Sequence, residues 1–278
     1  MDLSQFITNA LHEDIGDGDH TSLASIPGNT QGKAKIFAKE DGIIAGIELA
    51  EQIFRTVDVH LKFEAESSDG DPVNNGDTLI YISGKTQSIL KAERLVLNCM
   101  QRMSGIATLT NKMVQLLDGL STKILDTRKT TPGFRYIEKW AVRIGGGGNH
   151  RFGLYDMIMI KDNHIDFSGG ISNAIQNTQT YLKEHNKELQ ICIEARSVED
   201  VKEILGCGGV DRIMLDNFST ALLKEAVDLI NGEYKTEATG GINIDTIRSY
   251  AESGVDYVSV GALTHSAGSL DISLIAID

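Results

Sequence analysis

The sequence predicts an α/β protein whose second half is a parallel sheet with helices between the strands. Six short apolar runs, rich in Ile, Val and Met, each end in a polar, charged or glycine residue, and they begin at Ile124, Met157, Ile191, Arg212, Thr236 and Tyr257. Runs of this length without clean alternation are typical of strands buried on both faces, and such strands belong to parallel sheets. Strand starts near 191, 212, 234 and 255 recur every 21 or 22 residues, with helical patterns between them. This period indicates a barrel related to the eight-fold (β/α) design but incomplete.

The first hundred residues follow a different pattern. Residues 32–40, 59–66 and 77–83 alternate partly between apolar and polar side chains, which is typical of half-buried strands. We expect a helix around Ile47–Thr56 and a long helix over 86–117, with a bend where Gly105 interrupts it. The prediction is an α+β domain over 1–108 and a barrel domain over 109–269, with 270–278 a candidate to rejoin the first domain.

Composition bounds the class of protein. The chain has 278 residues, 41% of them hydrophobic, and a net charge of −13, which argues against nucleic acid or an anionic membrane as a partner. No stretch approaches the roughly 20 apolar residues that cross a bilayer, and the N-terminus does not have the pattern of a secretory signal. The three cysteines, Cys99, Cys192 and Cys207, are odd in number and lack metal-binding spacing. We therefore expect them to be reduced core residues of a cytoplasmic protein.

The charge reverses between residues 128 and 161. This segment is rich in basic residues and its only acidic residues are Glu138 and Asp156. Such a basic segment in an acidic protein predicts a small, highly charged anionic ligand. The spacing of Arg135, Lys139 and Arg143 places these three along one side of a helix, and for them we favour a solvated surface.

Two segments of this basic region carry candidate anion ligands. Arg128 and Lys129 follow the first strand of the barrel; Arg can hold a carboxylate with two parallel hydrogen bonds, whereas Lys acts as a point charge suited to phosphate. The alternative is a surface pair at a strand end. Four glycines, Gly145–Gly148, precede His150 and Arg151 and would either bring backbone amides close to an anion or form a flexible turn.

The later strand ends carry the other candidates. Lys161 could form a Schiff base, hold an anion or pair with a carboxylate. Glu194 and Asp216 end successive strands and should lie side by side, where they could hold Mg²⁺, orient sugar hydroxyls, stabilise a cationic transition state or serve as counter-ions. The last two strands end in small residues that leave room for a phosphate, to which a following His could donate; these are Thr239, Gly240, Gly261 and His265.

These segments together resemble the quinolinate phosphoribosyltransferase family, a type II phosphoribosyltransferase family. The resemblance spans nearly the whole chain and is carried by Glu13–Gly16, Gly18–Ser22, Gln101–Thr108, Asp126–Gly133, Gly145–His164, Leu215–Asn217, Gly240–Ile242, Gly254–Tyr257 and Gly261–Ser266. It implies an N-terminal α/β sandwich domain, an incomplete C-terminal α/β barrel and a homodimer with active sites shared across subunits. It also implies phosphoribosyl transfer from phosphoribosyl pyrophosphate to quinolinate with decarboxylation, in NAD biosynthesis, with Mg²⁺ as cofactor.

The resemblance also implies a role for each matching residue. Around the quinolinate carboxylates it would place Arg128, His150, Arg151 and Lys161, with Arg102 supplied across the subunit interface. At the ribose and pyrophosphate, with Mg²⁺, it would place Lys129, Glu194 and Asp216. The 5-phosphate would lie against Thr239, Gly240, Gly261 and His265. Two positions depart from the family: Cys192 stands where many relatives have an additional Glu, and Thr239 where Ser is frequent.

Three other functions fit parts of the pattern. A relative acting on nicotinate would need fewer cations than the segment supplies, which favours quinolinate. A barrel aldolase would use Lys161 as a Schiff-base nucleophile. A non-catalytic sensor of phosphorylated ligands would be hindered by Glu194 and Asp216, because these carboxylates repel anions.

Overall fold

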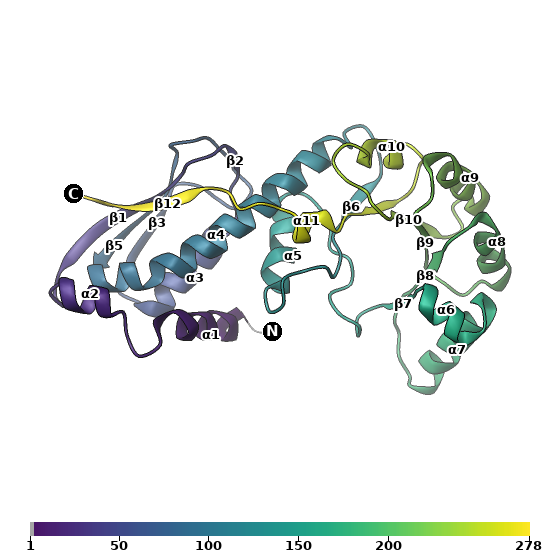
Figure 1. Cartoon of the computed structure of the whole chain (residues 1–278), viewed down its shortest axis with the longest axis horizontal. Coiled ribbons are helices and arrows are strands. Elements are labelled where there is room, and N and C mark those ends of the chain that lie inside the picture. The colour runs from purple at the N-terminus through teal and green to yellow at the C-terminus, as the bar shows by residue number, and fades with distance from the viewer. Residues whose placement is uncertain (1–2) are drawn as a thin grey trace. The chain divides into compact units, whose positions relative to one another are not determined.

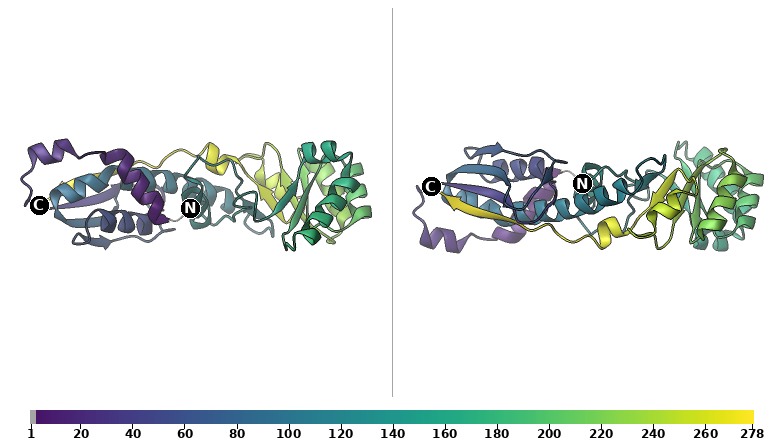
Figure 2. Two further views of the ribbon diagram at one scale, coloured as in Figure 1. Left: turned by 90° about the horizontal axis from the view of Figure 1, so that it is seen from below. Right: turned by 90° about the horizontal axis from the view of Figure 1, so that it is seen from above.

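The chain divides into two compact units that do not follow its linear order. The structure, a computed structural model, describes residues 3–278. One unit comprises Met1–Asn111, Thr130–Gly146 and Leu263–Asp278, and the other, the barrel unit, comprises Lys112–Lys129 and Gly147–Ala262 (Figures 1 and 2).

The first unit is built on an antiparallel sheet in the order β12-β1-β5-β3. Its strands are β1 (Gln31–Ala38), β3 (Lys62–Ala65), β5 (Thr78–Lys85) and β12 (Ile272–Ile277). A small second sheet pairs β2 (Gly42–Ile43) with β4 (Pro72–Val73). Residues along β1 alternate, with Ala34, Ile36 and Ala38 buried, as the half-buried strand pattern predicts. The C-terminal segment belongs to this sheet, because β12 pairs with β1 from Lys33 opposite Ile277 to Ala38 opposite Ile272.

Helices complete the first unit. They are α1 (Leu3–Ile15), α2 (His20–Ser25), α3 (Ile47–Val57), α4 (Thr86–Gln115, which continues into the barrel unit), α5 (Arg135–Ile144) and the short α11 (Ala262–His265). The helices expected around 47–56 and over 86–117 are therefore present. Two expectations about this region were wrong. Lys139 on α5 is only 2% exposed, so the charged side of that helix is not uniformly solvated.

The second error concerns the interruption expected at Gly105. The helix α4 continues through Gly105 without interruption. A Cβ at this position would collide with the carbonyl oxygen of Gly268. Hydrogen bonds hold the passing segment there, from the Leu270 amide to the Gln101 carbonyl at 3.0 Å and from the Gln101 side-chain amide to the Ile272 carbonyl at 2.8 Å. Gly105 thus permits a close approach of backbone to helix.

The barrel unit contains the six predicted strands, paired in parallel in the order β6-β11-β10-β9-β8-β7. They are β6 (Lys123–Leu125), β7 (Ile158–Ile160), β8 (Ile191–Ala195), β9 (Arg212–Asp216), β10 (Lys235–Thr239) and β11 (Tyr257–Ser259). Among the described residues β6 and β7 are the outer strands of the sheet and do not pair with each other, so the barrel is incomplete as predicted. All five residues of β8 are buried, which agrees with a strand covered on both faces.

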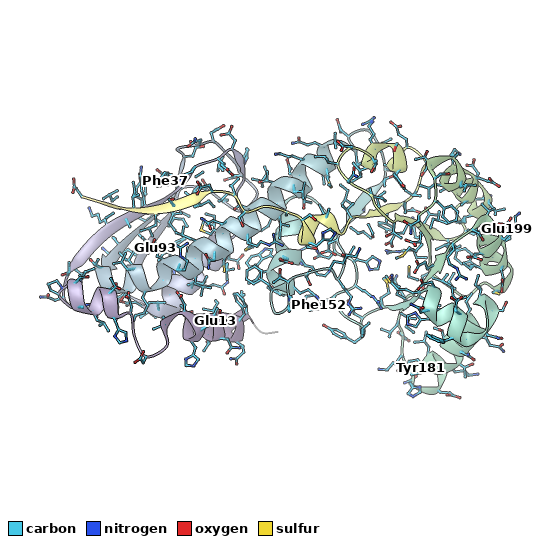
Figure 3. All side chains as sticks on the ribbon, viewed as in Figure 1. Glu13, Phe37, Glu93, Phe152, Tyr181 and Glu199 are labelled. Carbon is cyan, nitrogen blue, oxygen red and sulfur yellow. The ribbon has the colours of Figure 1, made fainter. Side chains whose placement is uncertain are left out.

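The helices of this unit lie outside the curved sheet (Figure 1). They are α6 (Asp162–Ser168), α7 (Ile171–Glu184), α8 (Val198–Cys207), α9 (Thr220–Ile230) and α10 (Ile247–Ala251). Figure 3 shows Glu199 of α8 on this outer side, while side chains fill the inside of the curve. All three cysteines are free, but Cys207 is exposed, so the expectation of core cysteines fails for it. Within residues 3–278 no helix has the length and apolar character needed to cross a membrane.

Candidate active site

The carboxyl ends of the six parallel strands bring the predicted residues of the barrel unit to one edge of the sheet. Ile160 pairs with Ile193, so Lys161 and Glu194 follow at the same level. Thr239 pairs directly with Asp216. Because ligands in such folds bind outside the carboxyl ends of the strands, this edge is the candidate site.

An acidic pair with one cation occupies the middle of this edge. Lys161 Nζ lies 3.7 Å from Glu194 Oε2, and the Glu194 side chain is 7% exposed. Burial raises the pKa of Glu194 to about 7, an effect that Lys161 opposes and that neighbouring Asp216 increases. Among residues 3–278, Glu194 Oε2 has no hydrogen-bond partner although it is buried. A buried carboxylate oxygen without a donor indicates that a ligand group completes the site.

Two guanidinium groups form the cationic part of the edge. They are Arg128, which follows β6, and Arg151. The pKa of Arg151 is lowered mainly by burial and further by the nearby positive charge of Arg128, so the two groups lie close together. The Nε atoms of both are buried without a hydrogen-bond partner anywhere in residues 3–278. One nitrogen of Arg151, Nη1, donates to the Met157 carbonyl at 3.1 Å. Two adjacent cations with unused donors fit a ligand that carries more than one negative charge.

Buried carboxylates hold the segment that carries Arg151. Asp126, which is 0% exposed, accepts the His150 amide at 2.8 Å and the Asn149 side-chain amide at 2.7 Å. The His150 ring lies 3.2 Å from Glu237 through Nε2, and its Nδ1 accepts the Arg151 amide at 2.7 Å. Both ring nitrogens of His150 are therefore engaged within the chain, and its contact with a ligand stays a prediction.

Sequence reasoning missed Glu237, the charged residue in the middle of β10. It is 0% exposed and accepts hydrogen bonds from Arg212 Nη1 at 2.7 Å and Ser259 Oγ at 2.5 Å, besides its contact with His150. Burial raises its pKa, but these three partners hold the pKa of Glu237 below its ordinary value. A Glu inside an otherwise buried strand was the available signal, because such groups occur in cores only with partners.

The ends of β9 and β10 fit closely together. Gly240 has φ of +101°, and a Cβ there would collide with the side chain of Asn217. Asn217 itself has φ of 56°, and its amide donates to the Thr239 carbonyl at 2.9 Å. Glycine is therefore required at position 240. A phosphate bound closely against the backbone would require glycine there as well. Gly261 follows β11 in the same unit, and Lys129 is an exposed residue beyond β6.

The two remaining predicted residues, Arg102 and His265, belong to the first unit. Arg102 donates through Nε and Nη2 to Glu138 Oε1 at 3.0 and 2.8 Å, and through Nη1 to the Ala267 carbonyl at 2.6 Å. Glu138, which is 0% exposed, also accepts from Thr131. His265 Nδ1 lies 2.6 Å from the hydroxyl of the adjacent Ser266.

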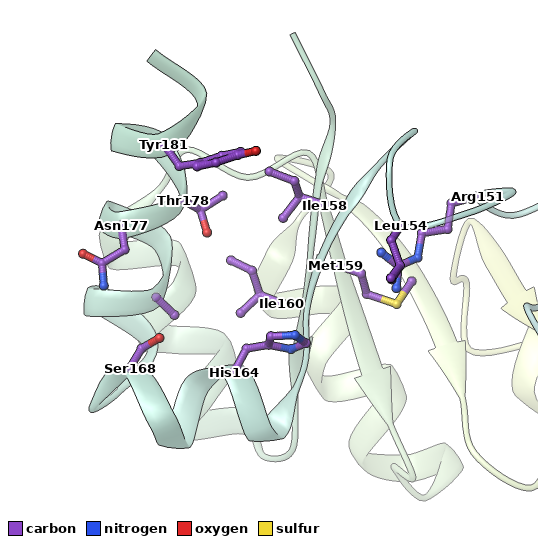
Figure 4. A pocket seen from close by; sticks show the side chains of 11 residues that line it. Arg151, Leu154, Ile158, Met159, Ile160, His164, Ser168, Asn177, Thr178 and Tyr181 are labelled. Atoms are coloured by element: carbon purple, nitrogen blue, oxygen red, sulfur yellow. The ribbon is translucent and has the colours of Figure 1, made fainter. Parts of the chain in front are cut away.

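A separate pocket of about 370 Å³ lies beside the edge strand β7. Figure 4 shows Ile158 and Ile160 facing Thr178 and Tyr181 of α7, whereas Arg151 and Leu154 lie beyond the strand. The lining is largely apolar and does not include Glu194 or Asp216. This pocket therefore shares Arg151 with the group of charged residues at the strand ends but does not include the carboxylates of that group.

Within the described part of the chain, the carboxylate pair is the part of this edge that suits a hard cation. Among the described residues no three His, Cys, Asp or Glu side chains are grouped as metal ligands. Magnesium in phosphate chemistry is commonly held by one or two carboxylates together with substrate oxygens. The oxygen of Glu194 that has no hydrogen-bond donor, beside Asp216, fits that mode of binding rather than a complete protein cage.

Comparison with known proteins identifies the family. Models of the quinolinate phosphoribosyl transferase N-terminal and C-terminal domains match residues 19–104 and 106–275. The quinolinate phosphoribosyltransferase [decarboxylating] 1b of Nicotiana tabacum is 48% identical, covering 98% of this chain and 82% of that protein. A probable nicotinate-nucleotide pyrophosphorylase [carboxylating] of Bacillus subtilis is 42% identical, covering 99% and 93%.

Solved structures agree with the sequence comparison. A crystal structure of NadC from Streptococcus pyogenes superposes with a TM-score of 0.93 at 39% identity, covering 99% of this chain and 97% of that one. The nicotinate-nucleotide pyrophosphorylase of Ehrlichia chaffeensis gives the same TM-score and identity, covering 100% and 99%. The predicted two-domain α/β architecture and the predicted resemblance are both confirmed, and the chain belongs to the quinolinate phosphoribosyltransferase family.

Proposed function

We propose that this protein transfers the phosphoribosyl group of phosphoribosyl pyrophosphate to quinolinate, releasing pyrophosphate and carbon dioxide and forming nicotinate mononucleotide. One observation carries the proposal: two guanidinium groups whose buried Nε donors are unused share a strand-end edge with the buried Glu194 and its neighbour Asp216. The names of relatives matched over 98% and 99% of the chain support the same reaction.

Quinolinate has two adjacent carboxylates on a pyridine ring, and two neighbouring guanidinium groups match it. Without a ligand, Arg128 and Arg151 repel each other. Burial lowers the pKa of Arg151 most, and the positive charge of Arg128 lowers it further. A doubly anionic ligand relieves this repulsion and satisfies both Nε donors. Nicotinate has a single carboxylate and would leave part of this cationic group unmatched.

The acidic pair, Glu194 and Asp216, would act on positive charge rather than negative charge. As pyrophosphate leaves, C1 of the ribose becomes positively charged, and Glu194 and Asp216 are placed to stabilise that cation or to hold the ribose hydroxyls. When bound, Mg²⁺ neutralises charge on the departing pyrophosphate, and Glu194 and Asp216 are the residues that would hold it together with substrate oxygens. Lys161, already paired with Glu194, acts as an electrostatic clamp, and Lys129 would serve the ribose and pyrophosphate end of the ligand.

The remaining steps follow from the chemistry of the substrate. The pyridine nitrogen attacks C1, which makes the ring cationic. When carbon dioxide leaves, the electron pair of the broken bond stays on the ring carbon next to the cationic nitrogen, which stabilises it. A proton then binds to that carbon in place of the carboxylate. No Schiff base is needed, so Lys161 has no covalent role. The tight junction of Thr239, Gly240 and Asn217 is the proposed seat of the 5-phosphate, with Gly261 and His265 as further contacts.

We further propose a cytoplasmic homodimer in which Arg102 serves the site of the neighbouring subunit. The free cysteines are in keeping with a reduced compartment, and the resemblance supports the dimer. Several plant relatives are named as chloroplastic or mitochondrial proteins. Analytical ultracentrifugation tests the dimer, and an Arg102→Ala variant mixed with an Arg128→Ala variant tests sharing: activity should reappear on mixing if each site draws on both chains.

The direct test incubates the protein with quinolinate, phosphoribosyl pyrophosphate and Mg²⁺ and measures nicotinate mononucleotide and carbon dioxide. We expect equal amounts of both products with many turnovers per site. Replacing quinolinate with nicotinate should give little product. Turnover of nicotinate without carbon dioxide release, or trapping of a substrate on Lys161 by borohydride, would instead support the other two enzyme functions. A single turnover at most would indicate a sensor.

A further inference from the structure

The interior of the barrel unit holds a carboxylate that the proposed reaction does not use. Glu237 lies in the middle of β10, one oxygen accepting from Ser259 and the other from Arg212 and His150. Arg212 is 14% exposed and also lies over the Tyr257 ring at 4.3 Å. Burial of an ion pair seldom stabilises a fold by itself, because the loss of hydration offsets the attraction. Its placement beside the candidate site therefore suggests another role.

The geometry around His150 defines the protonation of its ring. The Arg151 amide donates to Nδ1 at 2.7 Å, so Nδ1 must present a lone pair. A neutral ring then carries its hydrogen on Nε2, which lies 3.2 Å from Glu237 Oε2 and donates to it. A doubly protonated ring would set two N–H groups against each other at Nδ1. Glu237 thus selects the tautomer that can accept the Arg151 amide.

This chain of contacts ends at the Arg151 backbone, from which the guanidinium projects. Asp126 fixes the preceding residues through the His150 amide and the Asn149 side chain. Glu237 fixes the following peptide through the His150 ring. Since the neighbouring glycine-rich segment gives little stiffness, these two buried carboxylates determine where Arg151 stands relative to Arg128.

We propose that Glu237 is a positioning residue for the pyridine-dicarboxylate subsite: acting through the Nε2–H tautomer of His150, it holds the Arg151 main chain so that both guanidinium groups can take the two carboxylates. This inference rests on the proposed function. It assigns to Glu237 an effect on one substrate only, because its contacts lead to Arg151 and not to the Glu194 and Asp216 pair.

The test compares variants with the whole protein. Glu237→Leu combined with Arg212→Met removes the buried pair together, so that no charge is left unpaired. We expect the KM for quinolinate to rise by up to about 100-fold, with kcat and the KM for phosphoribosyl pyrophosphate changing little. Glu237→Gln keeps an acceptor oxygen for His150 and should rescue most of the loss. Two matched controls should leave the quinolinate KM unchanged. Ser259→Ala removes only the partner of the other Glu237 oxygen, and Lys235→Gln removes the ion pair between the exposed Lys235 of β10 and Asp256.

A second measurement reads the His150 ring directly in the wild-type protein and uses a variant only to assign its signal. Nitrogen-15 NMR of the imidazole rings in the wild-type protein, with His150 assigned by comparison with His150→Gln, should show Nε2 protonated and Nδ1 unprotonated. A hydrogen on Nδ1 would overturn the inference, as would an unchanged quinolinate KM in the double variant or an equal rise in both KM values. If the wild-type protein forms no product, the proposed function fails; calorimetric binding of quinolinate alone to wild-type and double-variant proteins then decides the inference.

Discussion

Replacing Glu194 with Gln should remove a pH dependence of stability that this one carboxyl group imposes. Its side chain is 7% exposed, and burial raises its pKa from 4.5 to about 7, with Lys161 opposing the change and Asp216 increasing it. Between these two pH values the folded protein keeps a proton that the unfolded chain has lost. The free energy of unfolding of the wild-type protein therefore falls as pH rises through this window.

The size of the effect follows from the two pKa values. At about 1.4 kcal/mol per pH unit, the loss by pH 8 is about 3 kcal/mol. Gln has no proton to lose, so the stability of Glu194→Gln relative to wild type should be about 3 kcal/mol more favourable at pH 8 than at pH 4.5. Lys161 loses an ionised partner only at pH 8, and because it is half exposed this costs at most about 1 kcal/mol. The pKa of about 7 already includes this contribution.

Urea unfolding monitored by circular dichroism at pH 4.5 and pH 8 measures this difference. The control is Glu199→Gln on the outer face of α8, where the side chain is exposed and the two pH values should give the same result. An identical stability difference for Glu194→Gln at both pH values would refute the reasoning. In parallel, wild-type kcat/KM should rise with pH around 7, since the ionised form serves the ribose cation. The variant should lose that rise and about 100-fold in activity at pH 8.

Four further results are expected. Arg128→Ala should lower kcat/KM by about 100-fold and raise the quinolinate KM, because two charge-assisted hydrogen bonds disappear; unchanged steady-state kinetics would contradict its role. Lys161→Met should slow turnover, while mass spectrometry after borohydride treatment of the wild type should find no substrate adduct. Gly240→Ala should lower the free energy of unfolding by about 1–3 kcal/mol, measured in urea, since its φ is +101° and its Cβ meets Asn217; a stable, fully active variant would exclude the tight junction. Chelation of Mg²⁺ should abolish product formation, and added Mg²⁺ should restore it.

The sequence alone predicted the strands, their parallel pairing and the edge at which the charged residues meet. These features depend on local patterns, because an apolar run of strand length followed by a polar residue is enough to locate a strand and its carboxyl end. Lys161, Glu194 and Asp216 could therefore be placed at one edge before any coordinates were known. The antiparallel strands of the first unit were also predictable, because alternation along β1 records which face is buried.

Only the tertiary structure decided which groups are partners. His150 and Glu237 are 87 positions apart, and no pattern in either segment announces their contact. Gly105 appeared to interrupt its helix because the segment that passes over it, near Gly268, is distant in the chain. Lys139 appeared to be a surface residue because helical spacing indicates a shared face but not what covers that face. Local sequence fixes where a side chain leaves the backbone, whereas the energy of a buried charge depends on the atoms that the fold brings around it.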